Sequence, residues 1–385
     1  MTLQELIASK RVLLCCGSGG VGKTSVSASL GLAAALQGRK VCVLTIDPAR
    51  RLATAMGIDL EENAQNKIAP ETFEAAGLKP RGELYATMLH AKKTFDELVA
   101  KYASSPEARD RLLGTPAYQH GSAALTDSPE YMATEKLYEL YHECDYDLII
   151  VDTPPLKHAL DFLTAPTRFQ GMLTGNPMIR MLVDAFKAAQ NSRGGFLQRL
   201  GKASMFRILS MVTGEKAIRD AGEFFSAFAD LMGGFTDRAQ AIERLFQSDD
   251  CALLVVTSPN LITIEEALFL HEKITGYGMH NSGFIVNRVE PNYFRSLESE
   301  PEAEKLLGVL EKAPKIEGVP GELMHTLVGN MRHHEMRRRT EDKNVALLER
   351  QLSKTQFIAR VPELPKDVAD LKGLSVLAGH LNPQD

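Results

Sequence analysis

Residues 17–24 read Gly17-Ser18-Gly19-Gly20-Val21-Gly22-Lys23-Thr24. This stretch matches G-x-x-x-x-G-K-[ST], the motif of loops that bind nucleotide phosphates, at every fixed position. An apolar run at residues 11–16 precedes it, and a run rich in Ala, Leu and Ser follows at 24–37. Strand, loop and helix are therefore predicted in the order that the motif requires. A plain glycine-rich turn is the alternative, and it leaves this context unexplained.

The chemistry of the motif predicts a site for ATP and Mg²⁺. Glycines let the backbone N–H groups of the loop point inward at phosphate oxygens, and the positive end of the following helix adds attraction. We expect Lys23 to contact the β- and γ-phosphates and the Thr24 hydroxyl to ligate Mg²⁺. The predicted nucleotide-binding residues in this part of the chain are Gly17, Ser18, Gly19, Gly20, Val21, Gly22, Lys23, Thr24 and Ser25.

Short apolar runs predict a fold of the α/β class. They occupy residues 11–16, 40–46, 146–151, 252–257 and 283–287. Strands that are apolar on both faces are typical of a parallel sheet covered by helices on each side. We therefore predict a doubly wound, mostly parallel sheet of the P-loop type, formed by residues 1–165 and 249–385.

The intervening residues 166–248 predict an inserted α-helical subdomain, because they contain no convincing strand pattern. They hold six of the 14 Met residues and nine of the 16 Phe residues of the chain. Residues 91–143 also have a helical pattern and are expected to contribute helices to this subdomain. The Met and Phe side chains either pack a helical core or form a groove for an apolar partner, since Met adapts to varied apolar surfaces.

Two carboxylates follow predicted strands. Asp47 follows the strand at 40–46, and Asp152 follows the apolar residues 148–151. The carboxyl ends of parallel strands face the crevice where doubly wound folds bind ligands. We expect Asp152 to act on Mg²⁺ directly or through water, and Asp47 to orient and activate the attacking water. Lys23 and Asp47 are thus the predicted catalytic residues, although an isolated aspartate at a strand end is usually a cap or turn former.

Composition narrows the class of protein. The net charge is -5 and the pI is about 6.1, so no global positive field recruits nucleic acid or anionic lipid. The sequence has no apolar run that could span a bilayer and no signal-peptide core. Five cysteines without a C-x-x-C pair indicate reduced thiols in a cytoplasmic protein. The basic run at 331–339 is interpreted as a solvated helix face, with contact to anionic lipid or nucleic acid as the alternative, so membrane contact is at most peripheral.

These motifs together resemble those of the arsenite-pump ATPase (ArsA) family. That family includes the tail-anchored-protein targeting ATPase and is related to the MinD/ParA-like P-loop ATPases. Residues 16–24 resemble its deviant phosphate loop, residues 45–50 its switch I, and residues 151–163 its switch II. Residues 284–287 resemble the strand whose Asn reads adenine, and 361–365 the loop that closes over the base. By this resemblance the base-binding residues are Asn287, Pro362 and Glu363, and the switch residues are Pro48, Arg50, Thr153, Pro154, Pro155 and Lys157.

The resemblance implies a Mg²⁺-dependent ATPase in which two protomers face one another across two nucleotides. The predicted helical insertion falls where the family keeps its client-binding subdomain, so a hydrophobic client protein is the expected partner. Ser18 replaces the family lysine that reaches the partner's phosphates. Either Arg50 or Lys157 takes that role in a homodimer, or a paralogue that retains the lysine completes a heterodimer. The lack of C-x-x-C predicts no zinc, and the scattered cysteines argue against an arsenite site.

Three other functions remain open on the sequence. One is a regulatory switch of the MinD/ParA kind without client transport, and proteins of that kind generally lack a long helical insertion. Another is a metabolic enzyme of the same superfamily that phosphorylates or carboxylates a small molecule. The third is a GTPase, because Asn287-Arg288-Val289-Glu290 distantly resembles the Asn-Lys-x-Asp signature, in which the final carboxylate reads guanine.

Overall fold

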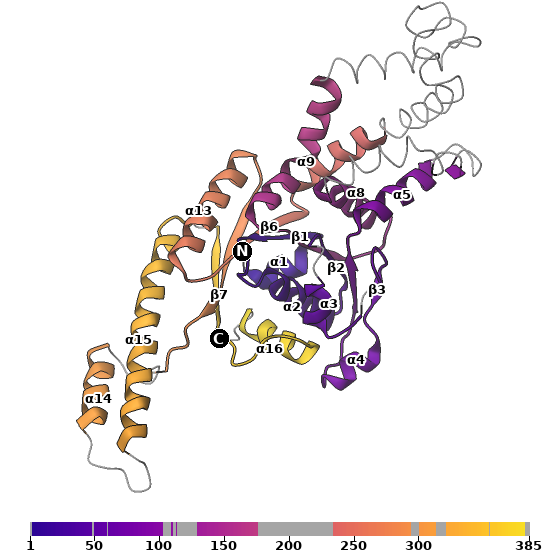
Figure 1. The fold of residues 1–385 in the computed structure, drawn as a ribbon. Helices are drawn as coiled ribbons and strands as arrows, with labels where there is room; N and C mark the ends of the chain where they lie inside the picture. Colours follow the sequence, from indigo (N-terminus) through magenta and orange to yellow (C-terminus); the bar gives the residue numbers. More distant parts are fainter. Residues whose placement is uncertain are drawn as a thin grey trace, which may run out of the picture.

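The structure is a computed structural model that describes residues 2–47, 50–59, 61–102, 109–110, 113, 129–175, 234–293, 300–312, 321–353 and 355–381. Its centre is an eight-stranded sheet in the order β3-β4-β2-β5-β1-β6-β7-β8 (Figure 1). All neighbouring strands are parallel except β3 and β4. The strands are β1 (Val12–Gly17), β2 (Lys40–Thr45), β3 (Asn66–Lys67), β4 (Glu83–Met88), β5 (Leu148–Asp152), β6 (Cys251–Thr257), β7 (Asn281–Val289) and β8 (Phe357–Pro362).

Helices cover both faces of the sheet and contribute to two separate apolar clusters. One face carries α1 (Leu3–Ser9), α2 (Lys23–Leu36), α3 (Arg51–Met56), α4 (Pro70–Ala75) and α16 (Leu371–Leu381). The other face carries α5 (Ala91–Tyr102), α8 (Pro129–His142), α9 (Leu156–Gly175), α13 (Leu261–Gly276), the helix at 234–246 and the end of α15 (Gly321–Glu349). The predicted doubly wound α/β sheet is therefore confirmed.

The alternation of side chains along β1 explains the two layers. Val12, Leu14 and Cys16 belong to the cluster under α8, α9 and α13, whereas Leu13 and Cys15 belong to the cluster under α2. All five side chains are at most 1% exposed. Successive residues of a strand point to opposite faces, so a strand that is buried on both faces must be apolar throughout. This requirement makes the central strands easy to recognise in the sequence.

The predicted strands correspond to β1, β2, β5, β6 and β7, with ends that differ by one or two residues. Two longer strands, β4 and β8, were not expected from the sequence. Both are only partly buried: the burial of β4 alternates over its first residues, and most of β8 is half-buried or exposed. Half-buried strands mix polar and apolar residues, which removes the continuous apolar run that identifies the central strands.

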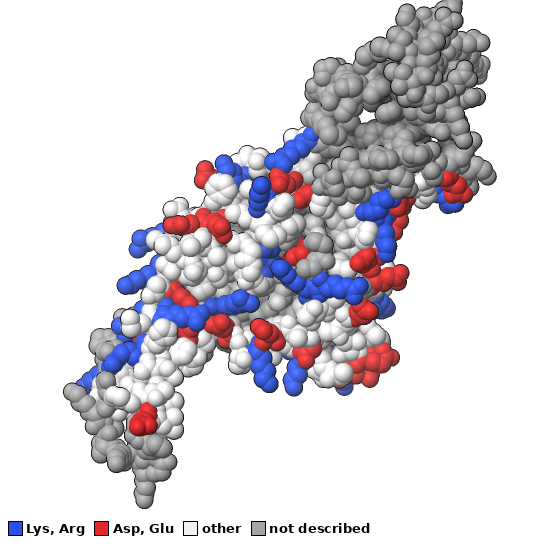
Figure 2. Space-filling model, in the orientation of Figure 1, with Lys and Arg blue, Asp and Glu red and all other residues white. Residues whose placement is uncertain are grey.

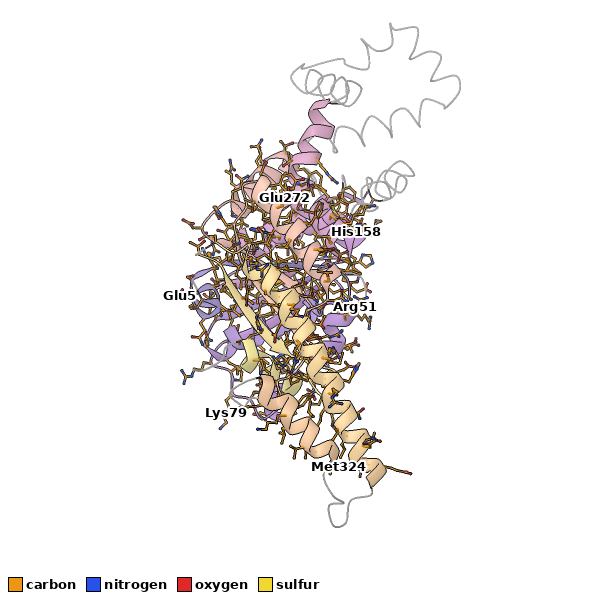
Figure 3. All side chains as sticks on the ribbon, turned by 90° about the vertical axis from the view of Figure 1, so that its left-hand side faces the viewer. Glu5, Arg51, Lys79, His158, Glu272 and Met324 are labelled. Carbon is orange, nitrogen blue, oxygen red and sulfur yellow. The ribbon has the colours of Figure 1, made fainter. Side chains whose placement is uncertain are left out.

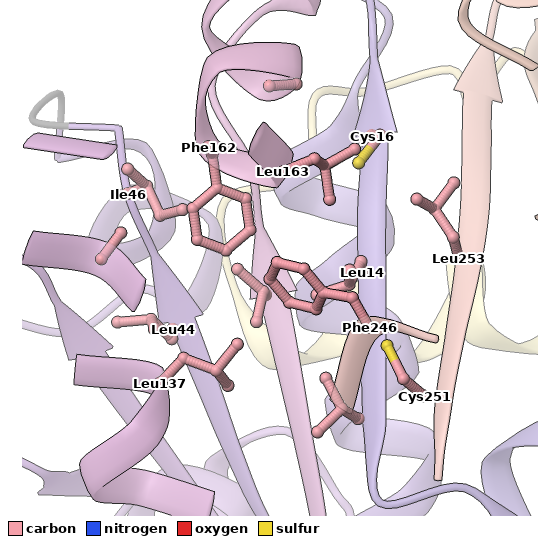
Figure 4. Close-up of a cluster of buried hydrophobic side chains, with 14 of the residues drawn as sticks. Leu14, Cys16, Leu44, Ile46, Leu137, Phe162, Leu163, Phe246, Cys251 and Leu253 are labelled. Atoms are coloured by element: carbon pink, nitrogen blue, oxygen red, sulfur yellow. The ribbon is translucent and has the colours of Figure 1, made fainter. Parts of the chain in front are cut away.

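Only the two ends of the predicted insertion are described. α9 continues to Gly175, and the helix at 234–246 returns to the sheet. Phe246 of this returning helix lies in the same buried cluster as Phe162 of α9 (Figure 4). Phe235 belongs to this cluster too. Within the predicted helical region 91–143, the described residues include α5 and α8, and both contribute side chains to that cluster. Residues 176–233 lie outside the described residues, so the subdomain at 166–248 stays a prediction.

A helical hairpin formed by α14 (Glu300–Lys312) and α15 projects from the opposite end of the molecule to α9 (Figure 1). Leu307 and Val328 form a small buried cluster between the two helices, and Met324 lies towards the end of the hairpin (Figure 3). The basic run at 331–339 lies on α15. Its arginines pair with nearby carboxylates, such as Arg338 with Asp342 at 2.6 Å between Nη1 and Oδ2.

The described surface is mixed in charge. Figure 2 shows acidic and basic side chains interspersed over the face that it presents. Among the described helices, none is both long enough and apolar enough to cross a membrane.

The packing of α9 against the helix at 234–246 generates a stability prediction. Phe162 is 0% exposed, and its ring lies 5.5 Å from that of Phe246, centroid to centroid. Phe162→Ala should lower the free energy of unfolding by about 3–5 kcal/mol, because it removes buried apolar contacts and leaves a cavity. Phe269→Ala is the matched control, since Phe269 is 45% exposed. Denaturant unfolding of both variants checks this, and equal losses would contradict the described packing.

Candidate functional site

A cavity of about 940 Å³ opens at the carboxyl ends of the central strands. Most of the residues that the sequence predicted to bind nucleotide, catalyse or switch line this cavity. They are Gly19, Gly20, Gly22, Lys23, Thr24, Ser25, Asp47, Arg50, Thr153, Pro155, Asn287, Pro362 and Glu363. The sheet therefore brings segments that are far apart in the sequence to one place.

The phosphate loop approaches its neighbours so closely that two positions accept only glycine. A Cβ atom on Gly17 would lie 2.0 Å from the carbonyl oxygen of Val256 in β6. A Cβ atom on Gly22 would lie 2.3 Å from Nδ2 of Asn287, and Gly22 also has a φ of 90°. L-residues rarely adopt this left-handed conformation. The two glycines thus allow the loop to pack directly on β6 and β7.

Side chains from β7 hold the middle of the loop. Asn287 donates from Nδ2 to the carbonyl oxygen of Val21 at 2.9 Å. Arg288 donates from Nη1 to the carbonyl oxygen of Gly20 at 3.3 Å, and its backbone has a φ of 60°. Asn287, the predicted adenine reader, therefore lies against the loop as well as in the cavity. Glycine-rich loops are flexible in isolation, so these contacts keep this one in shape.

Lys23 is buried at the first residue of α2 and is 8% exposed. Its Nζ donates to the carbonyl oxygen of Ser18 at 2.6 Å. Burial lowers the pKa of Lys23, and the nearby carboxylates of Asp152 and Asp47 oppose that shift. The Ser18 carbonyl oxygen thus holds the ammonium under the loop, and the negative charges of Asp152 and Asp47 favour its charged form.

Asp152 lies beneath Thr24 and is 1% exposed. One of its oxygens, Oδ2, accepts hydrogen bonds from Oγ1 of Thr24 at 2.7 Å and from Oγ1 of Thr45 at 3.0 Å. The other, Oδ1, is buried without a hydrogen-bond partner in the described part of the chain. Burial raises the pKa of Asp152 to about 6, although Thr24 and Lys23 act against the shift.

These residues fit Mg²⁺. A buried carboxylate oxygen without a partner costs free energy, and a hard cation with oxygen ligands would remove that cost. Thr24 would hold the ion, with Asp152 behind the Thr24 hydroxyl. Thr45, which was not expected from the sequence, shares Asp152 with Thr24, and its signal was its place near the end of the strand predicted at 40–46.

Asp47 lies at the cavity wall with its side chain 17% exposed. Arg51 faces it, with Nη1 3.3 Å from Oδ2 of Asp47, and also lines the cavity. The sequence analysis named Arg50 and not Arg51. Arg50 lines the cavity too, but its guanidinium pairs with Asp59 at 3.0 Å.

The remaining predicted switch residues divide into three groups. Pro48 lies outside the described residues. Thr153 is buried and donates from Oγ1 to the carbonyl oxygen of Cys15 at 2.9 Å, so switch II is fastened to β1. Lys157 is exposed on the first turn of α9, and neither it nor Pro154 is among the residues that line the cavity.

Ser18 points away from the cavity. Its hydroxyl donates to Oε2 of Glu266 on α13, and the residue is only 5% exposed. From the sequence, Ser18 was expected as a nucleotide-binding residue of the loop and as the position of a missing cation, and not as a partner of α13. Nothing in the sequence pairs these two residues, because 248 positions separate them.

The predicted base-binding loop follows β8. Pro362 ends that strand, and the backbone N–H of Glu363 donates to the carbonyl oxygen of Val289 at 2.8 Å. Arg337 of α15 holds the Glu363 carboxylate at 3.0 Å. Both Pro362 and Glu363 line the cavity.

The Glu290 carboxylate, which would have to bind guanine in a GTPase, makes other contacts. Its side chain is 2% exposed and lies 2.7 Å from Nδ1 of His334 and 3.2 Å from Nη1 of Arg337. It does not line the cavity. The geometry therefore favours adenine over guanine.

Comparisons with known proteins identify related ATPases. Residues 10–305 match the family described as anion-transporting ATPases. The "Putative arsenical pump-driving ATPase 1" of Aquifex aeolicus (strain VF5) is 22% identical over 310 residues, which cover 79% of this chain and 70% of that protein. The "ATPase GET3" of Malassezia globosa (strain ATCC MYA-4612 / CBS 7966) is 27% identical over 197 residues, which cover 50% of this chain and 55% of that protein.

Two substitutions separate binding from chemistry. Lys23→Ala should abolish nucleotide binding or hydrolysis, because it removes the ammonium that meets the phosphates. Asp47→Asn should leave binding within about threefold of the parent and stop turnover, because an amide cannot accept the proton of the attacking water. Equilibrium dialysis with labelled ATP and a phosphate-release assay check the pair. If Asp47→Asn hydrolyses ATP at the parental rate, the assignment of Asp47 is wrong.

Burial of Asp152 generates a pH prediction for the protein in EDTA. Its pKa rises from 3.8 to about 6 on folding, so the folded state binds more protons between those values and stability falls as pH rises. Asp152→Asn does not ionise, so it should be more stable than the parent at pH 7.5, on the order of 2 to 3 kcal/mol. That advantage should shrink to about half by pH 5. Thermal unfolding at several pH values checks this, and an advantage that does not change with pH would refute it.

Proposed function

The chain belongs to the anion-transporting ATPase family, and from this premise we propose that ATP binding and hydrolysis switch a dimer between states that capture and release a partner protein with an apolar segment. The protein is an ATPase that converts ATP and water to ADP and phosphate. The dimer, the partner and the role of each residue are parts of the proposal. The names of the two relatives refer to an arsenical pump and to an ATPase, and they do not identify a partner protein for this chain.

The observation that carries the proposal is the short connection from Asp152, beside the expected Mg²⁺ site, to the Met- and Phe-rich segment. Asp152 ends β5, and α9 begins four residues later at Leu156. Thr153 and Pro155, in between, include cavity-lining atoms. α9 then continues for 20 residues to Gly175, with Pro166 in its interior, and so reaches into the predicted insertion. A displacement at the nucleotide would therefore move the first turns of a helix that enters the proposed client-binding region.

The start of α9 is also tied to a second helix. Nδ1 of His158 lies 2.8 Å from a carboxylate oxygen of Glu130 on α8. Ala159 and Phe162 are fully buried in the cluster that α8 also enters. α8 and α9 would therefore move together, and this supports a coupled response of the helices that border residues 166–248.

In the proposed mechanism, each polar group of the cavity has one task. The loop amides and Lys23 bind the phosphates and stabilise the charge that develops on the transferred phosphoryl group. Asp47 orients the attacking water and accepts its proton, and Arg51 keeps the Asp47 carboxylate in place. Thr24 holds Mg²⁺, with Asp152 behind it. The bound ion would neutralise charge on the phosphates.

Dimerisation enters the proposal because Ser18 cannot supply a cation. A cation provided by a partner can raise hydrolysis by P-loop enzymes by about 10³–10⁵-fold. In a homodimer, Arg50 or Lys157 would have to supply it. In a heterodimer, a paralogue with lysine at this position would supply it. The exposed position of Lys157 and the exposed ion pair of Arg50 leave both side chains able to move.

Metal cargo is less well supported than a protein client. Burial raises the pKa of Cys15, Cys16 and Cys42 to about 12 and also raises that of Cys251. A thiolate is the form that binds soft metals and metalloids, and these thiols remain protonated at neutral pH. The absence of C-x-x-C in the sequence argues against zinc. We also propose that the protein acts in the cytoplasm.

A regulatory switch of the MinD/ParA kind remains the second candidate. In such a switch the ATP-driven dimer is itself the output, and no client is needed. The Met and Phe content of residues 166–248 favours the client-binding function, because a regulatory switch has no use for a large apolar insertion.

The test is nucleotide-dependent binding of a labelled, hydrophobic helical peptide in detergent-free buffer. Affinity should differ at least about fivefold between the ATP and ADP states, since a switch needs a coupling free energy of about 1 kcal/mol or more. Asp47→Asn should stay in the ATP state and show no change with time. A polar helical peptide of equal length is the control. Equal affinity for the hydrophobic peptide in both states would count against the proposal and favour the regulatory switch.

A further inference from the structure

A hydrogen-bonded chain links α13 to the catalytic lysine through the backbone of one loop residue. The Ser18 hydroxyl donates to the Glu266 carboxylate, and the Ser18 carbonyl oxygen accepts from Nζ of Lys23 at 2.6 Å. Ser18 and Lys23 are 5% and 8% exposed, so water competes little for these contacts. The conformation of Ser18 therefore decides where the lysine ammonium lies.

α13 is a firm base for such a contact. Asn260 caps its first turn, with Oδ1 accepting from the backbone N–H of Ile262 at 2.9 Å. Ile264, Ala267 and Leu270 are at most 2% exposed, so the helix is anchored on both sides of residue 266. The helix also follows β6 directly, the strand on which Gly17 packs. β6 thus contacts Gly17, and α13, which follows β6 in the chain, contacts Ser18.

Side chains of β7 hold the later half of the loop. Asn287 and Arg288 donate to the carbonyl oxygens of Val21 and Gly20. Glu266 contacts the first half of the loop through the Ser18 hydroxyl. Without the Glu266–Ser18 contact, residues 18 and 19 would become ordered only when the nucleotide binds. The entropy cost of that ordering would weaken nucleotide binding.

We propose that Glu266 is a positioning residue, which fixes the first half of the phosphate loop through the Ser18 hydroxyl and so prepares the loop for nucleotide. This inference rests on the nucleotide site proposed above. Glu266 touches neither phosphate nor water in this role. It holds the loop amides and the lysine in the arrangement that the triphosphate requires, before the triphosphate arrives.

The proposal makes a specific kinetic prediction. A preordered loop benefits the ground state and the transition state alike, so its loss raises KM and leaves kcat nearly unchanged. A hydrogen bond to a charged group is worth about tenfold or more in an equilibrium constant. Glu266→Ala should therefore weaken ATP binding about tenfold and raise KM by a similar factor, with kcat changed by less than about twofold.

Four further variants make the test specific. Ser18→Ala should reproduce the loss, and Ser18→Ala with Glu266→Ala should be no worse than either alone, because both remove one contact. Glu266→Gln keeps an acceptor oxygen and should bind ATP within about threefold of the parent. Glu265→Ala is the matched control, since Glu265 is the exposed neighbour on the same helix. Ser18→Ala leaves α13 intact, so it remains informative if Glu266→Ala does not fold.

Calorimetric titration with ATP and steady-state kinetics on the full chain give the answer. Parental affinity in Glu266→Ala, or losses in the two single variants that add in the double variant, would overturn the role of Glu266. Equal loss in Glu265→Ala would also overturn it, because the effect would then come from charge on α13 and not from the contact. A parent that binds no nucleotide would instead refute the site itself, so the two failures are distinguishable.

Discussion

The close approach of the phosphate loop to β6 and β7 is the constraint on which the rest of the site depends. Gly17 and Gly22 leave no room for a Cβ atom, because a strand carbonyl and the Asn287 amide occupy that space. The approach lets side chains of β7 and α13 hold the loop from both sides. The loop can then present its amides without the cost of being ordered by the ligand. A sheet that is buried on both faces supplies the rigid frame for these contacts.

Charge burial connects this frame to chemistry. Lys23 and Asp152 are both nearly inaccessible to solvent. Burial lowers the pKa of Lys23 and raises that of Asp152, so it favours the neutral form of each side chain. Such an arrangement is costly for folding, and proteins keep it where charge is needed for function. One carboxylate oxygen of Asp152 has no hydrogen-bond partner among the described residues, and the other accepts hydrogen bonds from two hydroxyls. Both features are consistent with a bound magnesium ion at this place. The helix that starts beyond Asp152 then carries any change at this centre outward.

The sequence was informative where one local rule decides the structure. The central strands are apolar throughout, and the loop motif has fixed spacing, so β1, β5 and the position of the loop between β1 and α2 could be predicted. Strand β8 and the neighbours of Ser18 could not. The former is half-buried and lacks a continuous pattern, and the latter depend on a contact between residues 248 positions apart. Glu290 shows the same limit, because only the fold reveals that its carboxylate is taken by His334 and Arg337.

The central claim is that the loop grips a magnesium–triphosphate complex. Isothermal titration of the unaltered protein with a non-hydrolysable ATP analogue, with and without Mg²⁺, tests it most directly. The titration should show saturable uptake of about one nucleotide per chain, tighter with Mg²⁺ than in EDTA, as expected for a loop of this type. Folded protein that takes up no nucleotide under either condition, alone or with its co-purifying subunits, would contradict it.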